Sequence, residues 1–296
     1  MSNETSPMRL QSPLGIKNNF SASTNLIKKI LFIFLGFLVV AQIFPFIWLF
    51  TYSIKKSSEL FGPDLLSWPK EPQWNNYYRA FTQGRIPLYL SNTLRIVIPS
   101  VALGTILPFC IAYACTRMEW KLKKLVWSIV ILGMTIPIHT TLLPNFFWYR
   151  IFGLLDTHLA LIISYMAFTM SFNSIVLSGL ILTIPKSMEE SAFIDGAGYF
   201  TILRKIIAPM AVNGFITVGI MTFLNHWNDW LMANTYLSTE VKRTLPFSII
   251  RFHGQYASEY AVQFAVMFCV AVPPLVFYFA FNKWMLAGVT AGAVKG

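Results

Sequence analysis

Residue patterns that catalyse reactions or bind nucleotides are missing from this sequence of 296 residues. It contains no G-x-x-x-x-G-K-[ST] phosphate loop, no H-E-x-x-H zinc motif and no G-x-S-x-G nucleophile elbow. Its four histidines, His139, His158, His226 and His253, are far apart along the chain, so no local spacing predicts a metal site. We therefore expect a chain that is not an enzyme and that holds no cofactor or metal of its own.

One polar stretch, the loop from Pro185 to Pro209, contains residue spacings that predict where a short helix begins and ends. Ser187 and Glu190 have the spacing of a capping box, which predicts a helix that begins at Ser187. Gly196 can end this helix in a left-handed turn. One face of the helix would carry Met188, Ala192 and Asp195. Such a helix is either a simple connection or a rigid docking element, and local chemistry leaves both interpretations open.

Composition predicts the elements that hold this loop. Hydrophobic residues make up 55% of the chain and charged residues only 12%, about half the roughly 25% of a soluble domain. Six apolar runs are each long enough to cross a hydrocarbon core of roughly 30 Å. They are Ile30–Ile54, Leu88–Cys115, Leu125–Tyr149, Leu159–Ile184, Ile206–His226 and Ala261–Trp284. We expect an all-α, polytopic membrane bundle of six transmembrane helices over residues 30–286, with an N-terminal segment (1–29) and a C-terminal tail (287–296).

The net charge of +11 comes mainly from Lys and Arg residues between the apolar runs, where such residues anchor loops to lipid and set orientation. Nucleic-acid binding would need these cations gathered on one face, which the sequence does not show. The short loops near Lys28 and at Arg117–Lys124 favour a cytoplasmic location for both termini. Two long loops, Lys55–Pro87 and Asn228–Tyr260, would then face outward, where each could meet a partner.

Ionisable side chains are scarce inside the apolar runs, and the third and fourth runs have none except His139. Ion-coupled carriers usually need Asp, Glu or His at membrane depth. The sequence therefore favours a transporter that draws its energy from elsewhere. An ion-coupled six-span secondary transporter, or a channel, is the alternative.

The loop from Pro185 to Pro209 resembles the EAA loop of ABC importer permeases, whose pattern is E-A-A, three residues, Gly, nine residues and I-x-L-P. The matching residues are Glu190, Ser191 and Ala192, then Gly196, Ile206 and Pro209, with Ser191 replacing an Ala and Ala208 replacing the Leu. The C-terminal stretch from Trp284 to Gly296 resembles the end of maltose-type carbohydrate permeases, specifically the smaller of the two paired permeases. Similarity extends over nearly the whole chain, including Pro45–Trp48, Asn76–Tyr77, Leu154–Thr157 and Trp227–Trp230.

This resemblance implies a type I ABC importer of the bacterial inner membrane that moves a sugar by alternating access, and the sugar it implies is an oligosaccharide. Its other parts would be a second homologous permease subunit, two ATPase subunits that bind ATP and Mg, and an extracytoplasmic solute-binding protein. The ATPase would be contacted by Glu190, Ser191, Ala192, Asp195 and Gly196, and by the tail residues Thr290, Gly292 and Lys295. The binding protein would face Arg243, Arg251, His253 and Tyr256. No residue is assigned to the sugar at this stage.

Overall fold

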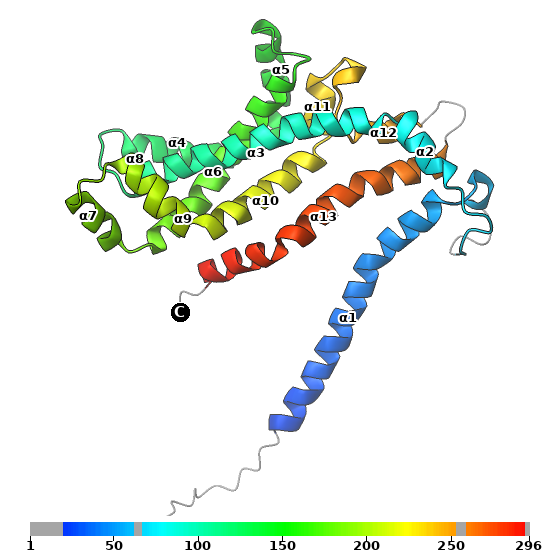
Figure 1. Ribbon diagram of the computed structural model, residues 1–296, viewed down its shortest axis with the longest axis horizontal. Helices are drawn as coiled ribbons and strands as arrows, with labels where there is room; N and C mark the ends of the chain where they lie inside the picture. Colours follow the sequence, from blue (N-terminus) through cyan, green and yellow to red (C-terminus); the bar gives the residue numbers. More distant parts are fainter. Residues whose placement is uncertain (1–19, 62–66, 253–258, 294–296) are drawn as a thin grey trace, which may run out of the picture. The chain divides into compact units, whose positions relative to one another are not determined.

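The computed structural model describes residues 20–61, 67–252 and 259–293, and every regular element within these ranges is a helix (Figure 1). The chain divides into two units, Met1–Trp48 and Leu49–Gly296. Unit 1 holds most of α1 (Phe20–Ser53), which is strongly apolar from Ile27 onward. Large side chains such as Phe32 and Ile33 are exposed along it, as expected of a helix surrounded by lipid.

Unit 2 is built around four longer helices, α3 (Ile86–Thr116), α6 (His158–Thr183), α10 (Val212–Asn228) and α13 (Tyr260–Ala293). α3 packs against α6 and α10, and α10 packs against α13 (Figure 1). The shorter α-helices are α2 (Asn75–Thr82), α4 (Lys123–Thr135), α5 (Leu142–Ile151), α7 (Lys186–Ile194), α8 (Tyr199–Ile202), α9 (Ala208–Met210), α11 (Leu231–Tyr236) and α12 (Phe247–Ile250). Single 3-10 turns are η1 (Ser57–Glu59), η2 (Ile138–Thr141) and η4 (Glu240–Lys242), and η3 (Leu203–Ile207) is a π-helical turn.

α3 and α6 approach closely because a glycine of α3 leaves room for a side chain of α6. A Cβ atom on Gly104 would lie only 2.7 Å from the hydroxyl oxygen of Thr169. Asn173 of α6 donates hydrogen bonds from Nδ2 to the Gly104 carbonyl at 2.6 Å and to the Thr222 hydroxyl of α10 at 3.0 Å. In lipid, small residues and interhelical hydrogen bonds of this kind drive helix association. They hold α3, α6 and α10 together as one core.

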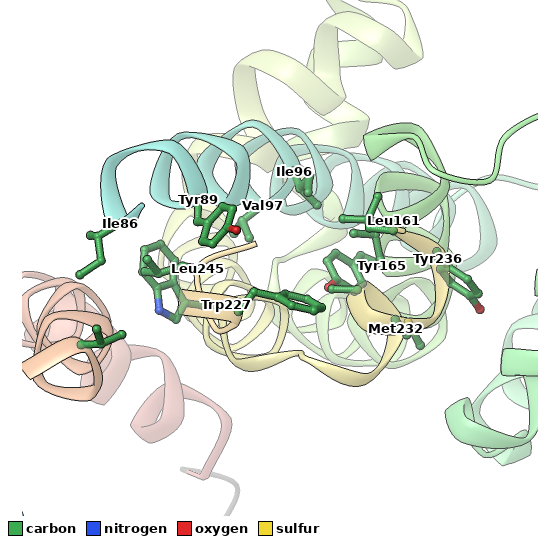
Figure 2. Close-up of a cluster of buried hydrophobic side chains, with 14 of the residues drawn as sticks. Ile86, Tyr89, Ile96, Val97, Leu161, Tyr165, Trp227, Met232, Tyr236 and Leu245 are labelled. Carbon is green, nitrogen blue, oxygen red and sulfur yellow. The ribbon is translucent and has the colours of Figure 1, made fainter. Parts of the chain in front are cut away.

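Two apolar clusters fill unit 2. The larger one joins α3, α6, α10, α11 and α13, and its aromatic members Tyr89, Tyr165 and Trp227 are drawn in Figure 2. The second cluster includes Phe109 of α3 and Leu177 of α6, and Ala192 of α7 packs into it. α7 lies at one end of unit 2, and α2 and α12 lie at the opposite end (Figure 1). The loop from Pro185 to Pro209 is therefore fastened to one end of the helical core.

Two of the six predicted spans are not single helices. Four helices of the described residues are long and apolar enough to cross a membrane, and the number rises to six only if two bent pairs each count as one span. The predicted run Leu125–Tyr149 is broken by 97° between Lys123–Thr135 and Ile138–Ile151. Pro137 lacks an N–H and disfavours helical geometry at the preceding residue, so Ile136 is extended and α4 ends there.

The predicted run Ile206–His226 is likewise a bent span and not one straight helix, because Tyr199–Met210 and Val212–Asn228 meet at 77°. A π-helical turn at Leu203–Ile207 and Pro209 precede the bend. Both features disturb the regular hydrogen-bond ladder, which makes them common sites of kinks. The apolar content of this stretch was predicted, but its direction was not.

Candidate functional site

The helix expected at the start of the Pro185–Pro209 loop is present as α7, although it begins differently. α7 starts at Lys186, one residue before the predicted start, and Pro185 is its N-cap. Ser187 therefore lies inside the helix and not at its N-cap, so the predicted capping box of Ser187 and Glu190 does not form at the start of α7. Ile184 and Pro185 are extended, since a residue before proline avoids helical geometry, and this places the boundary at the proline itself. Ser191 donates its hydroxyl to the Ser187 carbonyl at 2.9 Å, within the helix.

The end of α7 is confirmed as a left-handed glycine turn. Gly196 has φ +81°, its N–H donates to the Phe193 carbonyl at 3.0 Å, and the Ala197 N–H donates to the Ala192 carbonyl at 2.9 Å. These two bonds are the pair that defines a Schellman motif. Ala192 and Ala197 both pack on the second apolar cluster, as the hydrophobic contact of that motif requires. The chain direction after α7 is therefore set by backbone geometry.

Replacing Gly196 by alanine is expected to destabilise this turn by about 1–2 kcal/mol, because L-residues are strained at positive φ. Nothing lies within 4 Å of a Cβ built on Gly196, so the expected cost comes from the backbone alone. Gly198 is a matched control, since its φ is −80° and a Cβ there also meets nothing within 4 Å. Melting in detergent should fall for Gly196→Ala and stay unchanged for Gly198→Ala. Equal melting of the two variants would contradict the strain argument.

α7 presents a mixed acidic and apolar surface. Glu190, Ser191 and Asp195 are exposed, whereas Ala192 is 8% exposed and faces the core. Ile194 is 87% exposed, and Phe200 in the following helix is 74% exposed. Exposed large apolar side chains, together with an exposed carboxylate in the same loop, are what a protein-docking surface needs. We name Glu190, Ile194 and Phe200 the docking surface.

The neighbouring acid, Glu189, points the opposite way and is buried. Its Oε1 lies 3.1 Å from Nε of Arg117, and the two side chains are 8% and 3% exposed. Tyr113 donates its hydroxyl to Oε2 of Glu189 at 3.1 Å. Arg117 also donates from Nη2 to the carbonyls of Ile181 and Ile184 at the end of α6. One buried cation thus ties the ends of α3 and α6 to α7, an arrangement we call the Arg117–Glu189 lock.

Sequence reasoning missed Glu189, because the EAA pattern drew attention to Glu190 alone. A signal was present, since Glu189 stands three residues before Ala192 and therefore shares its inward face. The sequence pattern identifies Arg117 only as a cation of the short loop Arg117–Lys124.

At the opposite end of unit 2, Asp156 joins two loops that are far apart in sequence. Its Oδ1 accepts hydrogen bonds from the N–H groups of Ser238 and Thr239 at 2.9 and 2.8 Å. Its Oδ2 accepts from the Thr239 hydroxyl at 2.6 Å and from Lys242 Nζ at 2.9 Å. Burial alone would raise the pKa of this carboxyl group, but the hydrogen bonds from Thr239, Lys242 and Ser238 outweigh burial and hold its pKa well below the usual range.

Because the pKa of Asp156 is depressed in the folded protein, its contribution to stability is complete above the unfolded pKa of about 4 and is lost as pH falls below it. We expect Asp156→Asn to lower the melting temperature at pH 6. The gap between wild type and variant should begin to shrink as the pH is lowered from 5 to 3, because the unfolded wild-type chain then binds a proton at Asp156 that the folded chain does not bind. A gap that stays constant across this range would contradict a native role for the ionised form.

Of the four residues expected to face a binding protein, the structure describes Arg243 and Arg251. Arg251 pairs with Glu240 and donates from Nε to the Gln83 carbonyl at 2.8 Å, so its charge is used within the chain. Arg85 lies 3.7 Å from the same carboxylate. The guanidinium of Arg243 lies 4.5 Å from the centre of the Phe247 ring. His253 and Tyr256 lie outside the described residues.

The expected tail contacts are described only in part. Thr290 and Gly292 belong to the last turns of α13, which runs on to Ala293, beyond the predicted end of the sixth span at Trp284. Lys295 lies outside the described residues. The backbone of the predicted tail is therefore helical at Thr290 and Gly292.

Comparison with known proteins adds to this geometry. The family model described as "Binding-protein-dependent transport system inner membrane component" matches residues 101–290. The chain is 32% identical to the sulfoquinovosyl glycerol transport system permease protein SmoH of Agrobacterium fabrum, covering 95% of this chain and 97% of that protein. It is 30% identical to the trehalose transport system permease protein SugB of Mycobacterium tuberculosis, covering 85% and 92%. It is 28% identical to the trehalose/maltose transport system permease protein MalG of Thermococcus litoralis, covering 91% and 98%.

Among solved structures, a chain of a bacterial ABC transporter involved in the import of the acidic polysaccharide alginate matches with a TM-score of 0.78. The match covers 91% of this chain and 99% of that chain at 20% identity. At this identity the likeness supports the fold, a type I importer bundle.

Proposed function

This chain belongs to the family of binding-protein-dependent transport system inner membrane components, and from that premise we propose that it is the permease subunit of an ATP-driven ABC importer whose cargo is a sugar, an oligosaccharide. The observation that carries the proposal is the α7 loop, with an exposed Glu190 and a glycine-terminated helix at one end of the bundle. Relatives named for the transport of sulfoquinovosyl glycerol, trehalose and maltose support a sugar as cargo.

The partners follow from the same premise. We propose a second permease subunit, two ATPase subunits that supply ATP and Mg chemistry, and an extracytoplasmic solute-binding protein. The docking surface of Glu190, Ile194 and Phe200 would enter the ATPase subunit, together with Ser191, Ala192, Asp195 and Gly196 of the same loop. A carboxylate on this surface suits a basic partner, because charge-assisted hydrogen bonds are the stronger ones.

The Arg117–Glu189 lock would transmit movement of the ATPase subunit from α7 to α3 and α6. α7 is short, but its buried acid is joined to Arg117 and Tyr113, and through Arg117 to the end of α6. A displacement of α7 should therefore move α3 and α6 with it, as a rigid-body alternation between two states requires.

Both termini would lie in the cytoplasm, on the same side as the Pro185–Pro209 loop. Six crossings, the number reached when each bent pair counts as one span, support this arrangement, since an even number returns the chain to its starting side. The Lys and Arg residues of the short loops also favour it. The tail residues Thr290, Gly292 and Lys295 would then meet the ATPase subunits. Arg243, Arg251, His253 and Tyr256 would face the binding protein on the other side.

The test is ATP-driven sugar uptake by the whole complex. The chain should co-purify with a second permease and a P-loop ATPase, and the complex in proteoliposomes should take up saccharide only with ATP and the binding protein. Uptake by the purified chain alone, driven by a proton gradient, would establish the ion-coupled alternative. The family match gives that alternative no support.

A further inference from the structure

A cavity of about 420 Å³ opens between α6 and α10, beside the turn that leads into α11. Its size falls within the roughly 300–1,000 Å³ of small-molecule sites. Tyr165 and Met232, which line it, are labelled in Figure 2. The described residues that line it all lie outside the Pro185–Pro209 loop, so the docking surface does not account for it.

His226 is a buried polar side chain in the wall of this cavity. It is 6% exposed and its ring stacks on the Tyr165 ring, with 4.5 Å between centroids and 17° between planes. Neither ring nitrogen has a hydrogen-bond partner of good geometry among the described residues. A neutral imidazole carries one donor and one acceptor, and buried polar groups in native proteins are nearly always paired. The backbone of Tyr165 lies near the ring, and a hydroxyl-bearing ligand in the cavity would supply a partner of better geometry.

Two amide side chains extend the polar part of the cavity. Asn225 and Asn228 are three residues apart on α10, so they share one face of the helix, and both are exposed at the cavity. Each amide offers two donors and one acceptor. Phe168 and Phe172 of α6 line the same space with apolar rings. Amides together with aromatic rings suit a ligand that has hydroxyl edges and an apolar face of C–H groups, as a pyranose ring has.

The charge of the lining decides between neutral and anionic ligands. Among the residues that the structure describes, no Lys or Arg lines the cavity, and the titratable side chains that do so are His139, Tyr165, His226 and Asp229. Asp229 is already engaged: its Oδ2 accepts from the Tyr165 hydroxyl at 2.7 Å and from the Ala233 N–H at 3.2 Å. An anionic ligand would lose water beside this carboxylate without gaining a Lys or Arg partner from the described lining residues.

We propose that this subunit contacts the cargo directly in the cavity between α6 and α10, through Asn225, Asn228 and His226, and that the cargo part bound there is a neutral saccharide. The inference rests on the transport function proposed above and adds a substrate class to it. It differs from a purely structural cavity, because it requires the polar atoms of these side chains and not only their volume.

The test uses the complete importer with its binding protein in ATP-loaded proteoliposomes. The probes are trehalose, maltose and maltotriose as neutral saccharides, and a uronic-acid disaccharide as the acidic one. The double variant Asn225→Ala/Asn228→Ala should lower neutral-saccharide uptake by about tenfold or more, as expected when hydrogen bonds to the cargo are lost. Binding-protein-stimulated ATP hydrolysis should remain. The matched control is Asn213→Ala, an exposed asparagine in the first turn of the same helix that does not line the cavity.

Two substitutions of His226 distinguish a ligand contact from a packing role. His226→Gln keeps a donor and an acceptor and should retain more uptake than His226→Leu, whereas a packing residue would show the reverse order. An unimpaired double asparagine variant, or a complex that takes up only the acidic disaccharide, overturns the cavity inference while the importer function stands. A wild-type complex with neither binding-protein-stimulated ATP hydrolysis nor uptake of any probe refutes the proposed function itself.

Discussion

Arg117→Met is expected to cost about 3–5 kcal/mol of stability, the loss typical of removing one partner from a buried ion pair. Arg117 and Glu189 are 3% and 8% exposed, so water cannot replace the missing cation. The variant leaves the Glu189 carboxylate buried, with the Tyr113 hydroxyl as its remaining hydrogen-bond donor among the described residues. Thermal or denaturant unfolding of the detergent-solubilised complex measures the effect. ATP-driven uptake should fall with it, because α7 would no longer be joined to α3 and α6.

The double variant Arg117→Met/Glu189→Leu distinguishes a buried charge from general damage. It removes both charges, so it should be more stable than Arg117→Met alone. Recovery should be incomplete, since the carbonyls of Ile181 and Ile184 still lose the donor they share. Lys123→Met is the matched control, because Lys123 pairs with Glu119 at 2.8 Å but Glu119 is 89% exposed. Such surface pairs contribute only about 0–1 kcal/mol. A double variant no more stable than Arg117→Met would contradict the lock.

Glu190→Lys is expected to leave the fold intact and to abolish coupled transport. Glu190 is exposed in this chain, and surface substitutions usually change stability by no more than about 0.5 kcal/mol. In the complex the same carboxylate would be desolvated against the ATPase subunit, where losing one partner of a buried charge pair costs about 2–5 kcal/mol. ATP-driven uptake should therefore fall by about tenfold or more, while membrane insertion and melting of the chain remain as in wild type.

Glu119→Lys provides the comparison for that experiment. It reverses an exposed carboxylate in the loop between α3 and α4 that is not one of the residues of the docking surface. Uptake by Glu119→Lys should be close to wild type. Normal uptake by Glu190→Lys, or equal loss in both variants, would remove Glu190 from the docking role.

The two neighbouring glutamates, Glu189 and Glu190, separate what the sequence pattern predicts from what only tertiary packing decides. The EAA spacing identified Glu190 by pattern, and its exposure agrees with a surface role. Glu189 has the same residue type and nearly the same position, yet it is buried against Arg117, which lies 72 positions earlier in the chain. Only the packing of α7 on α3 and α6 could separate them, because a helix turns by about 100° from one residue to the next.

Local chemistry alone determined the apolar runs, the scarcity of charge within them and the left-handed turn at Gly196, since each depends on a residue and its immediate neighbours. The capping box at Ser187 failed because the extended geometry at Pro185 started the helix one residue earlier. The bends of 97° and 77°, the Asp156 hydrogen bonds and the cavity at His226 were decided only by the tertiary structure. These features depend on which distant segments pack against each other. An apolar run predicts that a segment is buried in lipid or protein, but it does not predict which segment packs against it.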